Sequence, residues 1–199
     1  MLKWKLLASK YLFQNKPWLT IRQDQVKLST GKVMDGYYVF EYPDWVTILA
    51  IDVEGYFIMI KQYRHALGEV NYELSAGVCD EEDENHLESA KRELLEETGY
   101  GGGTWSQWTV NSANPGTHTN LTYCYIAEGV SLQAKQKLDD TEEIEVHKLT
   151  KDEVMHLLVT NQIRQALHAS ALWKYMAQKI GIWPLTPYPR SQKIITNSN

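Results

Sequence analysis

Apolar residues in the first half of the chain gather in short runs, and each run predicts a strand. Residues 45–51 are almost continuously apolar, which is typical of a strand buried on both faces. A turn at 52–55 leads into a second strand at 56–64, and a third is expected at 70–74. Together the three runs predict the centre of a β-sheet.

The stretch that ends at Gly99 has a helical period instead. Its apolar positions are Leu87, Ala90 and Leu94, and its acidic positions are Glu93, Glu96 and Glu97. At 3.6 residues per turn the two sets lie on different faces of a helix. The apolar stripe can therefore pack on the sheet while the three carboxylates stay outside the core. Gly99 stands where a glycine commonly ends a helix.

Further elements are expected on both sides of this centre. The additional strands are predicted at 18–27, 37–42, 105–110, 120–127 and 143–148. Thr150 and Glu153 match a capping box that opens a helix to about Leu158, and a second helix is expected from Asn161 to about Ile180. The order of strands, helix, strands and paired helices predicts an α+β sandwich.

Composition narrows the possible partners. The 199 residues suit one domain with a small appended element, and the 43% apolar content allows a sizeable core. A net charge of −5 argues against a nucleic acid or an anionic membrane as the main partner. Lysines interrupt the apolar positions near the N-terminus, so no signal peptide is expected. Cys79 and Cys124 are the only two cysteines, as expected in a reducing cytoplasm.

The acidic helical face is the main candidate for chemistry. Three like charges on one face repel one another unless something positive lies among them. Ligation by oxygen atoms alone suits a hard divalent ion, so Mg2+ or Mn2+ is the expected cofactor. The simpler alternative is a solvated acidic helix without a ligand.

The pattern around this face is more specific than the charges alone. A glycine, a loop, an acid, seven residues and then Arg-Glu-Leu-Leu-Glu-Glu-Thr-Gly-Tyr run through residues 77–100. This stretch closely resembles the Nudix box of the Nudix hydrolases, which cleave a nucleoside diphosphate linked to another moiety. It departs at one point, because six residues separate Gly77 from Glu84 where the family usually has five. Asp83 keeps the spacing from Gly77, and Glu84 keeps the spacing to Arg92.

Other segments resemble one subfamily, the ADP-ribose pyrophosphatases. Pro115 lies sixteen positions beyond Gly99, near the spacing of that subfamily's marker proline. The runs at 62–65, 73–77 and 140–146 match it in order, although Ser75 stands where proline is common. The resemblance implies hydrolysis of ADP-ribose or a similar nucleoside diphosphate sugar to AMP and a sugar phosphate. The alternatives are a hydrolase of another sugar nucleotide and a ligand-sensing Nudix domain without turnover.

The resemblance also implies an architecture and residue roles. It implies an α/β/α sandwich around a mixed β-sheet, with an N-terminal antiparallel β element at 1–43, a Nudix domain at 44–181 and a loosely held tail at 182–199. The implied catalytic residues are Arg92, Glu93, Glu97 and Glu142; the metal ligands Glu93, Glu96 and Glu97; and the substrate-binding residues Trp18, Tyr37, Tyr38, Arg64, Glu73, Gly77 and Pro115.

Two of these roles keep alternatives. Asp140 and Glu143 compete with Glu142 as the base that activates water. A homodimer is expected, in which aromatic residues of the N-terminal element stack on the adenine of the neighbouring subunit. Those rings could instead only fill the dimer interface.

Overall fold

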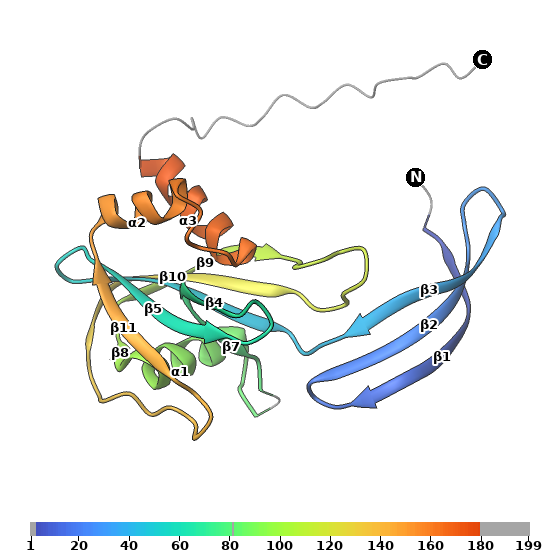
Figure 1. The fold of residues 1–199 in the computed structure, drawn as a ribbon, viewed down its shortest axis with the longest axis horizontal. Helices are drawn as coiled ribbons and strands as arrows, with labels where there is room; N and C mark the ends of the chain where they lie inside the picture. The colour runs from blue at the N-terminus through green and yellow to red at the C-terminus, as the bar shows by residue number, and fades with distance from the viewer. Residues whose placement is uncertain (1–2, 81, 180–199) are drawn as a thin grey trace, which may run out of the picture.

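The computed structural model describes residues 3–80 and 82–179, and its N-terminal part is a small separate sheet (Figure 1). The sheet consists of β1 (Lys5–Asn15), β2 (Leu19–Lys27) and β3 (Val33–Glu41), all antiparallel, in that order. The two strands expected here, at 18–27 and 37–42, correspond to β2 and β3, but β1 was not expected. β1 was missed because every one of its residues is exposed, so no alternation of buried and exposed positions marks it.

The main sheet is mixed. Its strands are β4 (Trp45–Asp52), β5 (Phe57–Arg64), β6 (Glu69–Glu73), β7 (Ser75–Val78), β8 (Tyr100–Gly101), β9 (Thr104–Asn111), β10 (Thr122–Leu132) and β11 (Ile144–Leu149). The central order is β11-β5-β4-β10-β8, with β6 beside β5, β7 beside β4 and β9 beside β10. β4 and β10 run parallel, and the other pairs are antiparallel.

Helices cover both faces of this sheet, as Figure 1 shows. α1 (His86–Thr98) lies on one face, and α2 (Lys151–Val159) and α3 (Ala166–Lys179) lie on the other. Alternate residues of β4 point into the two hydrophobic cores, one on each face of the sheet. Ile48 packs in the core with Leu94 of α1, whereas Leu49 packs in the core with Leu172 of α3. The expected α/β/α sandwich around a mixed sheet is therefore confirmed.

Local signals set the helix ends. The Asn85 side chain accepts hydrogen bonds from the first turn of α1, and Gly99 ends that helix with a φ of 75°. The capping box of Thr150 and Glu153 opens α2 as expected. α3 begins at Ala166 rather than at Asn161, because Asn161 adopts a left-handed φ of 57° that cannot continue a helix.

The N-terminal sheet joins the main domain through one segment. The Phe40 N–H of β3 donates to Thr117 O at 2.8 Å, and the Thr119 N–H donates back to Phe40 O at 3.1 Å. The His118 ring packs between the rings of Phe40 and Tyr42. The loop that contains Pro115 therefore holds the base of β3 beside the main sheet.

Two further expectations concern the rest of the chain. None of the helices in the described ranges is long and apolar enough to span a membrane. The tail at 182–199 and the predicted helix end near Ile180 lie outside the described residues.

Candidate active site

The position of Glu93 depends on a glycine. β7 passes so close to α1 that a Cβ atom on Gly77 would lie 2.0 Å from the Glu93 carboxyl carbon. Any side chain at this position would push the carboxylate away. Gly77 is therefore the residue that allows Glu93 to lie against the backbone of β7.

Arg92 forms hydrogen bonds with several of the acids. Its Nη1 donates to Glu93 at 2.9 Å and to Glu96 at 3.1 Å, while its Nη2 donates to Asp83 at 3.0 Å. The spacing conflict in the loop is thus resolved in favour of Asp83, because Glu84 is exposed and makes no contact with Arg92.

Glu97 is held from the opposite side. Its Oε2 accepts the Ala76 N–H at 3.1 Å, so β7 fixes this carboxylate as well. Burial raises the pKa of Glu97 to about 8 and that of Glu93 to about 7, although Arg92 opposes the shift at Glu93. Ionising both acids at neutral pH is therefore unfavourable unless a further positive charge is near.

A cavity of about 140 Å³ brings the acids together with a second segment of the chain. The residues that line it are Arg92, Glu93, Glu96, Glu97, Lys137, Leu138, Asp139 and Glu142. Glu142 is half-buried, whereas its competitors Asp140 and Glu143 are exposed. The charge of Glu142 also contributes to the raised pKa of both Glu93 and Glu97. Asp139, which the sequence did not single out, holds Glu142 by donating its N–H to Oε2 at 3.1 Å.

The chemistry of this cavity suits a divalent cation. Its carboxylates supply the hard oxygen ligands that Mg2+ and Mn2+ prefer, and the pKa values of two of them, Glu93 and Glu97, are raised. Within residues 3–80 and 82–179, however, no three acidic, histidine or cysteine side chains already converge on one point. A bound cation would therefore have to draw the carboxylates together.

A second cavity, of about 390 Å³, lies beside β7. Ala76 and Gly77 line this second cavity and also contact Glu97 and Glu93, so β7 links it to the acids of the first. Arg64 lines it too, and its guanidinium binds both oxygens of buried Glu73 at 2.8 and 2.6 Å. The structure thus brings Arg64, Glu73 and Gly77 together beside the acidic helix.

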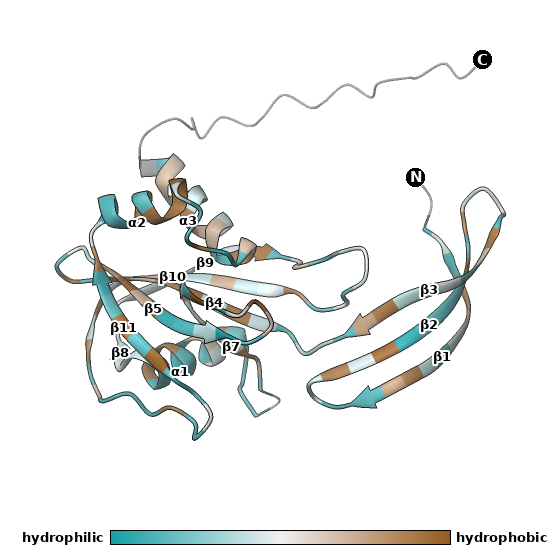
Figure 2. Ribbon diagram, in the orientation of Figure 1, coloured by the Kyte–Doolittle hydropathy of each residue, from teal (hydrophilic) through white to brown (hydrophobic). Residues whose placement is uncertain are grey.

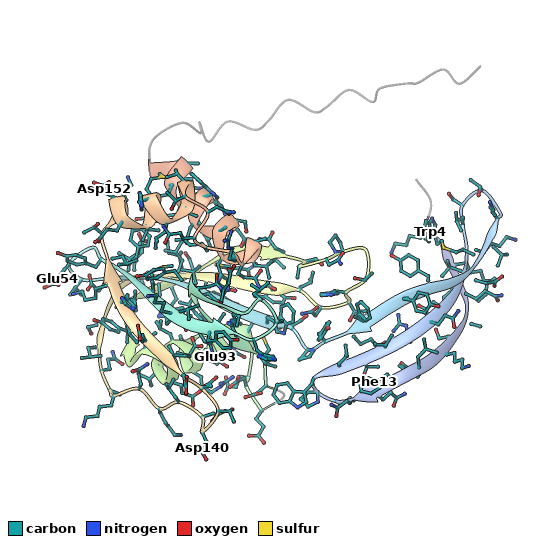
Figure 3. The ribbon with its side chains drawn as sticks, in the orientation of Figure 1. Trp4, Phe13, Glu54, Glu93, Asp140 and Asp152 are labelled. Carbon is teal, nitrogen blue, oxygen red and sulfur yellow. The ribbon has the colours of Figure 1, made fainter. Side chains whose placement is uncertain are left out.

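The remaining predicted substrate residues lie elsewhere in the chain. Trp18 is 70% exposed and Tyr38 is 51% exposed, both on the N-terminal sheet. Tyr37 and Pro115 line a separate cavity between that sheet and the loop at 115–119. Figure 3 shows Phe13 of β1 away from Glu93, and none of the four predicted residues lines the acidic cavity. A single subunit does not bring these four residues to the acidic cavity.

Sequence reasoning missed several residues of the larger cavity. They are Trp45, Thr47, Thr122, Gln165 and His168. Only His168 carried a local signal, as a polar residue on the face of α3 that also contains Ala171, Leu172 and Tyr175. Burial lowers its pKa to about 4, and Leu74 N–H donates to its Nδ1 at 3.3 Å.

The depressed pKa of His168 predicts a pH-dependent stability. Below about pH 6.5 the unfolded chain binds a proton at this histidine, whereas the folded chain does so only near pH 4. The free energy of unfolding should thus fall by up to about 3 kcal/mol between pH 6.5 and 4. Acids whose pKa is raised by folding, such as Glu93, make the free energy of unfolding change with pH in the opposite direction. The wild type must therefore be compared with His168→Asn by urea unfolding. The variant should lack this loss, and the exposed His156→Asn is the control; equal pH profiles for wild type and His168→Asn would contradict the assignment.

Comparisons with known proteins agree with this geometry. A model described as the nucleoside diphosphate sugar hydrolase N-terminal domain matches residues 4–40, and the NUDIX domain model matches residues 41–169. The chain is 31% identical to an ADP-ribose pyrophosphatase of Bacillus subtilis (strain 168) over 169 residues, covering 84% of this chain and 90% of that protein. It is 29% identical to a methanol dehydrogenase activator of Bacillus methanolicus over 161 residues, covering 80% and 85%.

A solved structure shows the same fold. The crystal structure of an ADP compounds hydrolase matches with a TM-score of 0.77 at 21% identity, covering 91% of this chain and 97% of that one. The NUDIX model covers well over half of the 199 residues, and it includes the acidic helix, β7 and both cavities beside them. The chain therefore belongs to the Nudix family and is a Nudix hydrolase.

Proposed function

We propose that this enzyme hydrolyses the pyrophosphate bond of ADP-ribose, or of a related nucleoside diphosphate sugar, to AMP or another nucleoside monophosphate and a sugar phosphate. One observation carries the proposal: the residues of β7 that line the larger cavity beside Arg64 also contact Glu93 and Glu97, which line the small acidic cavity. A substrate that crosses β7 can present its pyrophosphate to the acids and another part to the larger cavity. The similarity to ADP-ribose pyrophosphatases supports the substrate class.

Glu93, Glu96 and Glu97 would hold Mg2+ or Mn2+. A bound divalent ion supplies charge compensation to phosphate oxygens and lowers the pKa of water. The chain itself positions the ligands. Arg92 orients Glu93 and Glu96, and the Ala76 N–H orients Glu97.

Glu142 is the proposed base. It lines the same cavity as the three ligands, and it is the least exposed of the three loop acids considered for the role. A carboxylate there can take the proton of an attacking water while the box acids remain bound to the cation. Lys137 lines the same cavity and offsets some of the negative charge.

Product release from a panel of substrates tests this function. Purified enzyme should release AMP from ADP-ribose with Mg2+ or Mn2+, and EDTA should abolish the release. ADP-glucose and UDP-glucose extend the panel to other sugars and another base. Binding of ADP-ribose without release of AMP under all these conditions would favour a ligand-sensing domain and contradict the proposal.

Gly77→Ala tests the geometry between β7 and α1. The new methyl group would overlap the Glu93 carboxyl, so kcat should fall by at least about 10-fold, a barrier increase of about 1.4 kcal/mol. Gly77 has no left-handed backbone angle, so alanine introduces no backbone strain there. Circular dichroism and the melting temperature control for the fold. A folded Gly77→Ala enzyme with unchanged kcat would contradict the role assigned to this contact.

Glu142→Gln tests the base. We expect kcat to fall with little change in KM, because the substitution removes proton transfer and keeps the size of the side chain. Asp140→Gln and Glu143→Gln are matched controls, since both side chains are exposed. If all three variants keep the wild-type kcat, the base lies in the box helix.

We propose further that the enzyme is a homodimer assembled through its N-terminal element, residues 1–43. Exposed large apolar residues concentrate there, including Leu6, Tyr11, Leu12, Phe13 and Trp18. Figure 2 shows apolar residues along all three strands of the sheet, which stands away from the main domain. A three-stranded sheet with so much open apolar surface needs a covering partner. A second copy of the element would cover it and bring aromatic rings to the neighbouring site.

Trp18→Ala tests the shared site. Stacking of a base on an aromatic ring contributes about 1–3 kcal/mol, so KM should rise roughly 5- to 150-fold if Trp18 contacts adenine. Analytical ultracentrifugation must accompany the kinetics, so that loss of the dimer is not mistaken for loss of stacking. A dimeric variant with unchanged KM would leave Trp18 an interface residue only, and a fully active monomeric wild type would contradict the shared site.

A cytoplasmic location belongs to the same proposal. It is supported by Cys79 and Cys124, which are both free thiols.

A further inference from the structure

The larger cavity contains a polar group that the proposed reaction does not use. His168, in the first turn of α3, is only 4% exposed and lines this cavity together with Arg64 and Glu73. A histidine on the apolar face of a helix is most often a core residue whose hydrogen bonds are satisfied. The two ring nitrogens of His168 show that this one is different.

Only one of these nitrogens has a partner. The Leu74 N–H donates to Nδ1, so Nδ1 is an acceptor and the neutral ring carries its hydrogen on Nε2. Burial favours this neutral form. Within the described part of the chain, no group accepts a hydrogen bond from Nε2. Nε2 is not one of the enclosed polar atoms without a partner, so it has accessible surface, and the cavity that His168 lines is where a ligand can supply an acceptor.

A second polar side chain in the same wall also lacks a partner. Thr122 of β10 is 3% exposed and lines the cavity, and its hydroxyl makes no hydrogen bond within the described residues. Trp45, its register partner on β4, adds an aromatic side chain to the lining. Residues of α3 and β10 therefore line one cavity beside Trp45, and the enclosed Thr122 hydroxyl would reach a ligand there by rotating about its side-chain bond.

The charges near His168 favour a neutral ligand group. Glu73 takes two of the N–H donors of Arg64 and balances its charge, and His168 is neutral. The Glu73 carboxylate lies 3.8 Å from Nδ1 of His168, so an anion placed beside this ring would meet a negative charge. A neutral hydroxyl group fits better, because its oxygen can accept from Nε2 and its hydrogen can be donated to another oxygen.

We propose that His168 is a specificity-determining residue, which donates from Nε2 to a sugar hydroxyl of the substrate, with Thr122 as a second polar group of the same subsite. The inference rests on the proposed function, since it assigns the sugar part of a nucleoside diphosphate sugar to the larger cavity. It adds residues outside the Nudix box to the recognition of that substrate.

Two substitutions of His168 separate recognition from packing. His168→Asn keeps an acceptor near the Leu74 N–H and removes the Nε2 donor. His168→Gln places an amide near the position of Nε2 and removes the acceptor beside Leu74. For ADP-ribose, His168→Asn should raise KM about 3- to 10-fold with little change in kcat, the effect of one lost neutral hydrogen bond. His168→Gln should keep KM closer to wild type and lose thermal stability instead.

Substrate analogues provide the decisive cycle. Analogues of ADP-ribose that lack one sugar hydroxyl at a time are compared on wild type, His168→Asn and Thr122→Val. Removing the sugar hydroxyl that His168 contacts should lower kcat/KM of the wild type as much as His168→Asn lowers it for ADP-ribose. With that analogue, kcat/KM of His168→Asn should be no lower than its value with ADP-ribose. If losses from the variant and from every analogue simply add, or if His168→Asn and Thr122→Val both keep the wild-type KM, the subsite is overturned.

Binding keeps this test independent of turnover. Calorimetric titration of the same proteins with ADP-ribose in EDTA, where no turnover is expected, measures affinity directly. A wild type that binds ADP-ribose but does not cleave it with Mg2+ or Mn2+ would overturn the proposed function alone. The affinities of His168→Asn and Thr122→Val would still decide the role of the subsite, since it predicts weaker binding by both.

Discussion

The site depends on the close approach of β7 to α1. This approach places the Glu93 carboxylate where any Cβ atom at position 77 would lie, and it lets the Ala76 N–H reach Glu97. The carboxylates would repel one another if Arg92 did not bind Glu93 and Glu96. Two of these acids are nevertheless buried enough that their pKa values are raised. The fold thus assembles a compact cluster of negative charge that a divalent cation would stabilise.

The rest of the fold supports the contact between β7 and α1. The core between α1 and the sheet holds the acidic helix, and the core beneath α2 and α3 supports the opposite face, where His168 and Thr122 line the larger cavity. β7 lines the larger cavity, and its backbone holds two of the acids that line the smaller one. The N-terminal sheet stands apart and is joined mainly through β3 and the loop near Pro115. Its open apolar surface is the physical reason to expect a second subunit there.

The sequence predicted those parts of the fold that local periodicity encodes. β4, β5 and α1 followed from apolar runs and helical spacing, the end of α1 followed from Gly99, and the start of α2 followed from its capping box. β1 has no buried face, and β7 is built from Ser, Ala, Gly and Val, which read as a loop. The box acids were found from their spacing, but the choice between Asp83 and Glu84 depended on the path of the loop. His168 could not be assigned, because its contact with Leu74 joins residues 94 positions apart.

Direct measurement of Mn2+ binding tests the central claim that the Glu93, Glu96 and Glu97 cluster holds a divalent cation. Electron paramagnetic resonance titration of the wild type should show Mn2+ binding that Glu97→Gln weakens by at least about 10-fold, or about 1.4 kcal/mol. Glutamine at this position can still accept the Ala76 N–H, so the fold should survive the change. Glu84→Gln is the matched control, because Glu84 is exposed and Arg92 pairs with Asp83 instead. The Glu84→Gln protein should bind Mn2+ as the wild type does. Equal Mn2+ affinity in the wild type and in folded Glu97→Gln would contradict the account.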